Sequence, residues 1–232
     1  MADDSNAQEE QPVLALVFEL ENIAITGRDG LFKAFEKALS KQKVKFAPSQ
    51  YSRYCVDKSI HSGVEGVMNS EKGSESVDEA LVDEVIKNAE SELTAAAKSP
   101  NGDLDAAITR FGKKGIVFGA VSALPEALSE SLSTALNAEE RGITVGTTGN
   151  PRGRRLSSDS WRKLARKLDV RPFHCVALCT SAAGCRAAVA ANMICVAIPD
   201  AYTEFQDFGG ARAVLDSFDA KVVQRLFDAM ND

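Results

Sequence analysis

The chain has 232 residues, 44% hydrophobic and 26% charged, so it can bury a sizeable core as an ordinary globular protein. Its formal net charge of −6 gives no reason to expect nucleic acid as a partner. No apolar run approaches the ~18 residues of a membrane-spanning helix, and the polar, acidic start does not resemble a signal peptide. We therefore expect a cytoplasmic protein with a disordered acidic tail at 1–11 and no membrane partner.

The first expected element is a buried strand over residues 14–18, an apolar run too short for an ordinary helix. Glu19 and Glu21 follow it two residues apart, so an extended chain would project both carboxylates the same way. In an open parallel sheet, ligands bind at the carboxyl ends of the strands. The two glutamates are therefore candidate catalytic residues, although a solvated acidic turn has the same pattern.

A helical region follows this strand. Residues 26–30 (TGRDG) carry two glycines and predict a flexible connector. Between residues 31 and 98, apolar residues recur at helical spacing and no strand pattern is present. The motif from Ser76 to Glu79 predicts a capping box at the start of a long helix. We expect a helical cap at 30–98, inserted into a core formed by 12–29 and 99–232.

From residue 100 onward, helix and strand patterns alternate, which is typical of a parallel sheet wrapped by helices. Asp219 is expected to cap a closing helix. The predicted fold class is α/β, with a doubly wound, Rossmann-like parallel sheet and an all-helical cap inserted after its first strand. The expected strands of this second part cover 116–121, 143–145, 175–178 and 194–198.

The five cysteines indicate neither a zinc site nor a disulfide framework. Their spacings match no zinc pattern, and the chain has only two histidines. Cys175 and Cys195 lie inside apolar runs, where a thiol behaves as a small core residue. No metal is therefore expected at the cysteines.

At three stretches, the chain resembles the haloacid dehalogenase superfamily of phosphotransferases, in its β-phosphoglucomutase-like and phosphoglycolate-phosphatase-like branch. That family opens with a strand ending in an FDLDG-like motif, where this chain reads FELEN, and inserts a helical cap before a PxG stretch, here residues 100–102. Residues 176–200 (VALCTSAAGCRAAVAANMICVAIPD) are similar to the family's EDSxxGxxAAxxAGM segment. The resemblance covers residues 12–230 and implies the fold of that family.

By this resemblance, Glu19 and Glu21 stand where the family carries two aspartates. The first of these attacks phosphorus, and the second is the general acid/base. An added methylene moves each carboxylate by about an ångström, and a misplacement of ~1 Å can cost ~10²-fold in rate. Asn22 replaces the usual glycine and adds a side chain beside the site. Both catalytic positions are therefore degenerate.

Four further site residues follow from the resemblance. Ser122 stands at the family's phosphate-binding Ser or Thr, and Arg155 stands at its Lys with the charge kept. Thr180 and Ser181 stand where the family carries acidic metal ligands, and neutral hydroxyls are poor substitutes because magnesium prefers carboxylates and waters. We therefore expect no metal and no cofactor, with magnesium only if the chain is a divergent enzyme.

Charge is also distributed unevenly along the chain. Residues 71–92 hold eight acidic and two basic residues, whereas 151–171 hold eight basic and two acidic ones. Two solvated helix faces explain this pattern. Alternatively, Arg152, Arg154 and Arg155 hold an anionic ligand, or the cap and the core attract each other across a cleft.

Two functions from different classes follow from these observations. The first is a catalytically impaired member of the family, a pseudo-phosphatase with a binding or regulatory role, whose partner is a small anionic or phosphorylated ligand or a protein. The second is a divergent but active phosphatase or phosphomutase that acts on a small phosphorylated metabolite with Glu19 or Glu21 in catalysis. We prefer the first, because departures from the family coincide at three motifs.

Overall fold

The structure is a computed structural model that describes residues 13–73 and 77–231. The acidic tail expected at 1–11 and Ser76 of the expected capping box lie outside these residues. None of the described helices is both long and apolar enough to cross a membrane.

A six-stranded parallel sheet forms the centre of the fold. Its strands are β1 (Ala15–Glu19), β2 (Val117–Ser122), β3 (Ile143–Thr147), β4 (Cys175–Cys179), β5 (Ile194–Ala197) and β6 (Ala213–Val214). They lie side by side in the order β3-β2-β1-β4-β5-β6, so β1 is central and pairs with both β2 and β4. The strand order reverses at β1, which makes its carboxyl end a topological switch point.

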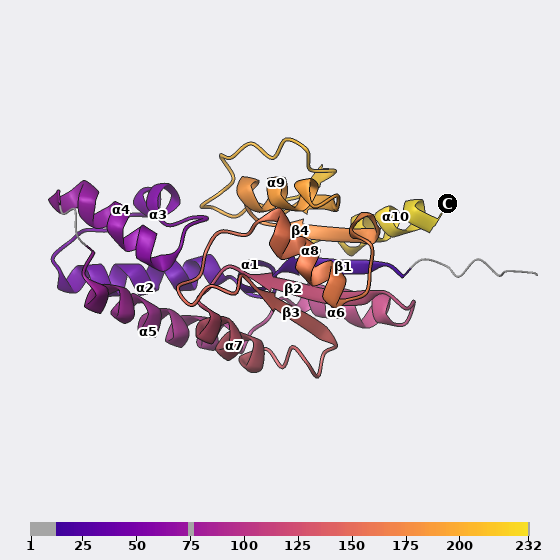
Figure 1. The fold of residues 1–232 in the computed structure, drawn as a ribbon, viewed down its shortest axis with the longest axis horizontal. Coiled ribbons are helices and arrows are strands. Elements are labelled where there is room, and N and C mark those ends of the chain that lie inside the picture. Colours follow the sequence, from indigo (N-terminus) through magenta and orange to yellow (C-terminus); the bar gives the residue numbers. More distant parts are fainter. Residues whose placement is uncertain (1–12, 74–76, 232) are drawn as a thin grey trace, which may run out of the picture.

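Helices and the loops that connect them make up the rest of the described chain (Figure 1). Those between β1 and β2 are α1 (Leu20–Ile23), α2 (Gly27–Lys41), α3 (Pro48–Tyr54), α4 (Ile60–Lys72), α5 (Glu79–Ala96) and α6 (Gly102–Gly112). Those after β2 are α7 (Glu126–Ala135), α8 (Ser158–Lys167), the 3-10 turn η1 (Pro172–His174), α9 (Ala182–Ala190) and α10 (Ala220–Asn231).

The sheet is buried on both faces, as the unbroken apolar run of β1 predicts. Leu16 and Phe18 point to one face and belong to the core cluster that includes α6, α7 and α10. Ala15 and Val17 point to the other face, which packs on α8 and α9 around the fully buried Trp161. Helices therefore cover both faces of a parallel sheet, and the predicted α/β fold class is confirmed.

The helical insertion, α2 to α5, contains no strand among its described residues. Figure 1 shows these helices gathered at one end of the molecule, past the carboxyl end of β1. Helices α2 and α5 lie close together. A Cβ added to Gly30 of α2 would lie only 3.4 Å from the Cβ of Glu92 of α5. The division of the chain into a cap domain at 30–98 and a core stays a prediction.

Two local predictions in this region are wrong. The expected connector at 26–30 is the start of a helix, since α2 begins at Gly27. A Cβ at Gly27 would overlap the carbonyl oxygen of Glu21, so this glycine permits a close approach rather than a flexible link. Helix α5 begins at Glu79, and its N-cap is Asp78, whose side chain accepts a 3.0 Å hydrogen bond from the Ala80 N–H.

Candidate functional site

The switch point at β1 brings together three of the residues singled out in the sequence. Glu19 is the last residue of β1, Ser122 is the last residue of β2, and Thr180 follows directly after β4. Because the three strands are parallel neighbours, their carboxyl ends lie at one edge of the sheet. The fold therefore sets the candidate site at this edge.

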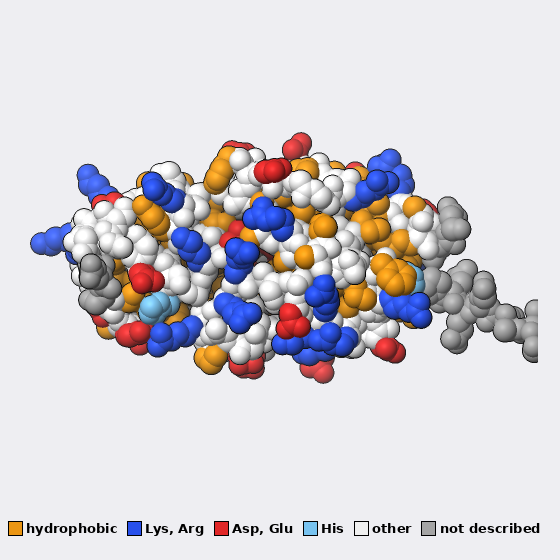
Figure 2. Space-filling model, turned by 45° about the horizontal axis from the view of Figure 1, so that its top comes forward, with side chains coloured by type: hydrophobic (Ala, Val, Ile, Leu, Met, Phe, Trp, Pro, Cys, Tyr) orange, Lys and Arg blue, Asp and Glu red, His pale blue; other side chains and the backbone are white. Residues whose placement is uncertain are grey.

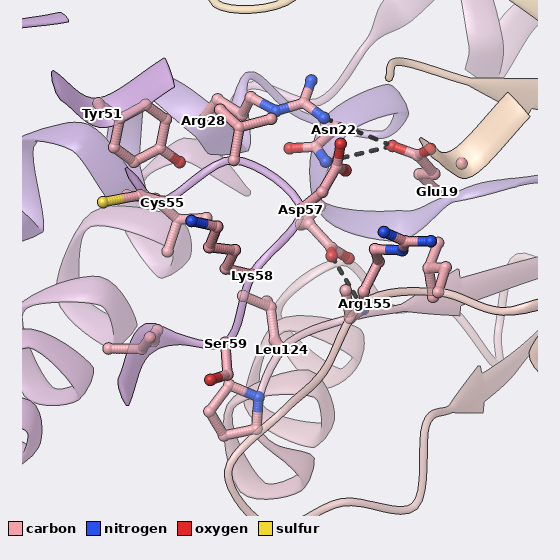
Figure 3. A pocket seen from close by; sticks show the side chains of 18 of the residues that line it. Glu19, Asn22, Arg28, Tyr51, Cys55, Asp57, Lys58, Ser59, Leu124 and Arg155 are labelled. Carbon is pink, nitrogen blue, oxygen red and sulfur yellow. Dashed lines mark hydrogen bonds and ion pairs between the residues drawn. The ribbon is translucent and has the colours of Figure 1, made fainter. Parts of the chain in front are cut away.

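A pocket lies at the same edge, between the sheet and the helical insertion (Figure 3). The pocket has a volume of about 70 Å³, which is enough for several water molecules or one small anion. Its polar lining comes from the core and from the helical insertion. The core supplies Glu19, Glu21, Asn22 and Arg155, and the insertion supplies Arg28, Tyr51, Asp57, Lys58 and Ser59.

Glu19 is buried, with 3% of its surface exposed, and both of its carboxylate oxygens have partners. Oε1 accepts a hydrogen bond from the Thr180 N–H at 3.2 Å. Oε2 accepts from the Thr180 hydroxyl and from Asn22 Nδ2 at 3.3 Å, and it lies 3.9 Å from Arg28 Nη2. Burial raises the pKa of Glu19, opposed by the charge of Arg28 and by the Thr180 hydrogen bonds. The carboxylate is thus held on the β4 side of the pocket.

Glu21 is equally buried but has a different environment. The chain turns into α1 directly after Glu19, so the extended geometry expected for the two glutamates is wrong. Oε1 of Glu21 accepts a 3.0 Å hydrogen bond from the Ala123 N–H, whereas Oε2 has no partner among the described residues. Burial raises the pKa of Glu21 to about 7. Glu21 can therefore gain or lose a proton near neutral pH.

Arg28, from the first turn of α2, lies beside Glu19 and is only 5% exposed. Its Nη1 donates to Asp200 Oδ2 at 2.5 Å and to the Thr180 carbonyl at 3.4 Å. Burial lowers the pKa of Arg28, but the charges of Asp200 and Glu19 outweigh this effect and raise it. Arg28 is therefore a buried, permanent cation at the site.

Sequence reasoning missed Arg28, although a signal was present. Arg28 precedes Leu31 by three residues and Phe35 by seven, so on a continuous helix it lies on the apolar stripe. A charged residue on such a stripe is expected to have a buried partner. Gly27 and Gly30 flank Arg28 and suggested a flexible connector, so this helical spacing was not recognised.

Ser122 does not line the pocket directly. Its buried hydroxyl accepts hydrogen bonds from the Leu124 N–H at 3.3 Å and from the Ser129 hydroxyl at 2.8 Å, in the turn between β2 and α7. It also lowers the pKa of Glu21, against the larger effect of burial. Ser122 therefore lies behind Glu21, and its role in phosphate binding stays a prediction.

Ser181 links the core to the helical insertion. Its hydroxyl donates a 2.7 Å hydrogen bond to Asp57, which lies between α3 and α4, and accepts one from the Gly184 N–H at the start of α9. Asp57 has a left-handed backbone with φ of 60°, a conformation that Asp tolerates. The hydroxyls of Thr180 and Ser181 are thus both donors to carboxylates.

Basic residues line the pocket and the groove that continues from it. Arg155 and Lys58 border both, and Arg152 and Arg154 border the groove alone. Figure 2 shows Lys and Arg side chains across the middle of one face of the molecule. Arg152 also lies 3.5 Å from Glu79 of α5, so the basic loop of the core contacts the acidic helix of the insertion. Exposed ion pairs of this kind contribute little to stability.

The residues present do not fit a magnesium ion. Among the described residues, no three His, Cys, Asp or Glu side chains are grouped so that they could hold a metal. Both oxygens of Glu19 have partners, and Glu21 offers one free oxygen, fewer than the several oxygen ligands that magnesium requires. The five cysteines are free and buried, and the burial predicted for Cys175 and Cys195 is confirmed.

Comparison with known proteins places this fold. No family model matches the chain. Among curated proteins, the protein CbbY of Cereibacter sphaeroides is 45% identical over 62 residues, a match that covers only 27% of this chain and 27% of that protein.

The whole fold is similar to solved structures. CbbY from Rhodobacter sphaeroides in complex with phosphate gives a TM-score of 0.69 at 21% identity, with 88% of this chain and 94% of that one covered. A β-phosphoglucomutase from Clostridium difficile gives 0.76 at 16% identity, covering 94% and 98%. A predicted phosphoglycolate phosphatase from Haemophilus somnus gives 0.71 at 12% identity, covering 94% and 99%. The chain therefore shares the fold of these proteins, and the fold implied by the resemblance is confirmed.

Proposed function

We propose that this protein is a pseudo-phosphatase: it binds a small phosphorylated or otherwise anionic ligand in the pocket and does not hydrolyse it by the family's magnesium-dependent route. One observation carries the proposal. Glu19, at the position of the family's nucleophile, is held by Thr180, Asn22 and Arg28. A carboxylate with both oxygens engaged in hydrogen bonds and an ion pair is a poor nucleophile, because its lone pairs are not free to attack.

The binding part of the proposal is supported by the cations at the pocket. Lys58 and Arg155 line it and can attract an anion, whereas the charge of Arg28 is paired with Glu19 and Asp200. Because the pKa of Glu21 is about 7, this residue is partly neutral at physiological pH and repels an anion less than a full charge would. Structures of CbbY contain phosphate or, in a point mutant, xylulose 1,5-bisphosphate, so this fold accommodates such ligands in another protein.

The proposal requires no cofactor. Charge neutralisation by a metal ion supplies much of the catalysis in phosphoryl transfer. The residues at this site do not fit magnesium, so the loss of the metal and the loss of a free nucleophile both lower the rate of phosphoryl transfer. Ligand binding without turnover is what then remains.

A divergent phosphatase or phosphomutase is the second candidate, and one observation favours it. Oε2 of Glu21 is unpaired, and the pKa of this carboxyl group is about 7, a value suited to a general acid or base at physiological pH. In that case magnesium would have to be held through Glu21. The turnover assay at the end of the Discussion separates the two candidates.

A cytoplasmic location and a protein partner belong to the same proposal. The five free cysteines fit a reducing compartment. A regulatory role implies a protein that distinguishes the loaded pocket from the empty one.

Calorimetric titration with inorganic phosphate in the presence of EDTA tests the binding proposal. We expect saturable binding that Arg155→Gln weakens about tenfold, because a charge-assisted hydrogen bond is lost. Arg166→Gln is the matched control, since Arg166 is exposed on α8, pairs with Asp159 alone among the described residues, and lies outside the pocket. Absence of saturable binding by phosphate and by simple phosphomonoesters would contradict the proposal.

A further inference from the structure

The guanidinium of Arg28 lies among three oxygens that come from three different parts of the core. These are Oε2 of Glu19 at 3.9 Å, the carbonyl oxygen of Thr180 at 3.4 Å, and Oδ2 of Asp200 at 2.5 Å. Glu19 ends β1, Thr180 follows β4, and Asp200 follows β5. Arg28 itself comes from α2, so these oxygens form a cage around a cation that the helical insertion supplies.

We propose that Arg28 is the built-in cation of this site: its guanidinium fills an oxygen cage that would otherwise bind a divalent metal ion, and so keeps metal out. The inference concerns a cation rather than the pocket's ligand. It therefore goes beyond the proposed function and can hold or fail independently of it.

Neighbouring hydrogen-bond donors fix the residues that supply the cage oxygens. Oδ1 of Asp200 accepts hydrogen bonds from the Tyr202 N–H at 3.0 Å and from the Thr203 hydroxyl at 3.2 Å. The same Thr203 hydroxyl donates to the Thr180 carbonyl at 2.7 Å. Thr203 is fully buried. The cage is therefore a pre-arranged structure that does not depend on Arg28 alone to bring its oxygens together.

The chemistry of the cage explains why a cation is required. A carboxylate in a buried position is costly unless a positive charge pairs with it, and here Glu19 is fully buried and Asp200 half-buried. Two carboxylates and a carbonyl are also ligands that Ca²⁺ and Mg²⁺ prefer. Arg28, 5% exposed, already meets this requirement, because its guanidinium occupies the position between these oxygens.

The test compares Arg28→Ala with the unaltered protein in thermal melts, first with EDTA and then with rising magnesium, calcium or manganese. We expect no saturable shift for the unaltered protein. Arg28→Ala should melt at a lower temperature in EDTA and regain much of the loss, saturably, with a divalent cation or with methylguanidinium.

Arg141→Ala is the matched control. Arg141 also pairs with a carboxylate, Asp105, and donates to a backbone carbonyl, Leu136, but it lies outside the pocket. This variant should be destabilised without any rescue by cations. The inference is overturned if folded Arg28→Ala shows no cation rescue, or if the unaltered protein shows the same saturable shift as the variant.

A second measurement covers the case in which Arg28→Ala does not fold. In the unaltered protein, the Nε–H NMR signal of Arg28 can be assigned by its loss in Arg28→Lys. We expect this signal to keep its intensity when stoichiometric manganese is added. Strong paramagnetic broadening would show that a metal ion enters the cage, and would overturn the inference.

Discussion

Thr180 holds Glu19 by two hydrogen bonds from a single residue: its N–H donates to Oε1 at 3.2 Å, and its hydroxyl donates to Oε2. By the family resemblance, Thr180 stands at a metal-ligand position and Glu19 at the position of the nucleophile. A carboxylate at position 180 would repel Glu19 unless a cation lay between them, whereas a threonine binds it directly. The two departures from the family pattern are therefore mutually compatible, and together they favour a metal-free site.

Thr180→Val tests this relationship. Valine has nearly the shape of threonine but removes the hydroxyl that donates to Glu19. The buried carboxylate then has one hydrogen bond fewer to offset the cost of its burial. We expect a loss of about 1–3 kcal/mol in the free energy of unfolding, measured by urea denaturation. Thr109→Val removes an exposed hydroxyl that donates to the Asp105 carbonyl, and should change this free energy by less than about 0.5 kcal/mol. Equal effects would contradict the account.

Gly184→Ala should also disturb Glu19. A Cβ at Gly184 would overlap Oε1 of Glu19, so either the α9 backbone or the carboxylate must move. Overpacking of this kind costs about 1–3 kcal/mol, and we expect a lower melting temperature. Gly102→Ala is the control, because nothing lies within 4 Å of a Cβ at that position in the first turn of α6. If both variants melt like the unaltered protein, the Glu19 geometry described here is wrong.

The stability of the protein should depend on pH through Glu21. Its pKa is raised from 4.5 to about 7, so the folded state binds more protons than the unfolded state between these values. The stabilisation is fully present below pH 4.5 and is lost as the pH rises through 7, by about 3 kcal/mol in total. The raised pKa of Glu19 acts with the same sign. Urea denaturation at several pH values measures this slope.

Glu21→Gln supplies the control for this dependence. The amide cannot ionise, so the decline between pH 4.5 and 7 should become shallower, with a remainder from Glu19. An unchanged slope in Glu21→Gln would show that this carboxyl group titrates normally.

Asp57→Asn should strengthen phosphate binding. The side-chain oxygen can still accept the hydrogen bond from Ser181, but a negative charge that lines the pocket is removed. One unit charge a few ångströms away is worth about 1 kcal/mol in a wet site, so the dissociation constant should fall about fivefold in a calorimetric titration. Asp83→Asn, on the exposed face of α5, should leave it unchanged. Weaker binding by Asp57→Asn would contradict the assigned charge balance.

The sequence predicted the parts of the site that depend on local pattern. The strands before Glu19 and Thr180 are short, unbroken apolar runs, and parallel pairing then brings their carboxyl ends together. It could not predict the orientation of Glu21, because α1 is a single turn with no periodic signal.

Arg28 and Asp57 were missed for a different reason. Both reach the site from the helical insertion. The spacing of Arg28 indicates burial, but the groups of the core that Arg28 and Asp57 contact depend on long-range packing. The glycine before Arg28 suggested flexibility, although its function is close contact with the Glu21 carbonyl group.

The central claim is that this site binds without turnover, and a phosphate-release assay tests it most directly. The substrates are a generic phosphate ester and small sugar phosphates, with magnesium present. We expect no release above background from the unaltered protein or from Glu19→Asp. Restoration should require Glu19→Asp, Glu21→Asp and Thr180→Asp together, with or without Arg155→Lys, because nucleophile, acid/base and metal act as a unit. Robust turnover by the unaltered protein that Glu19→Ala abolishes would contradict the claim.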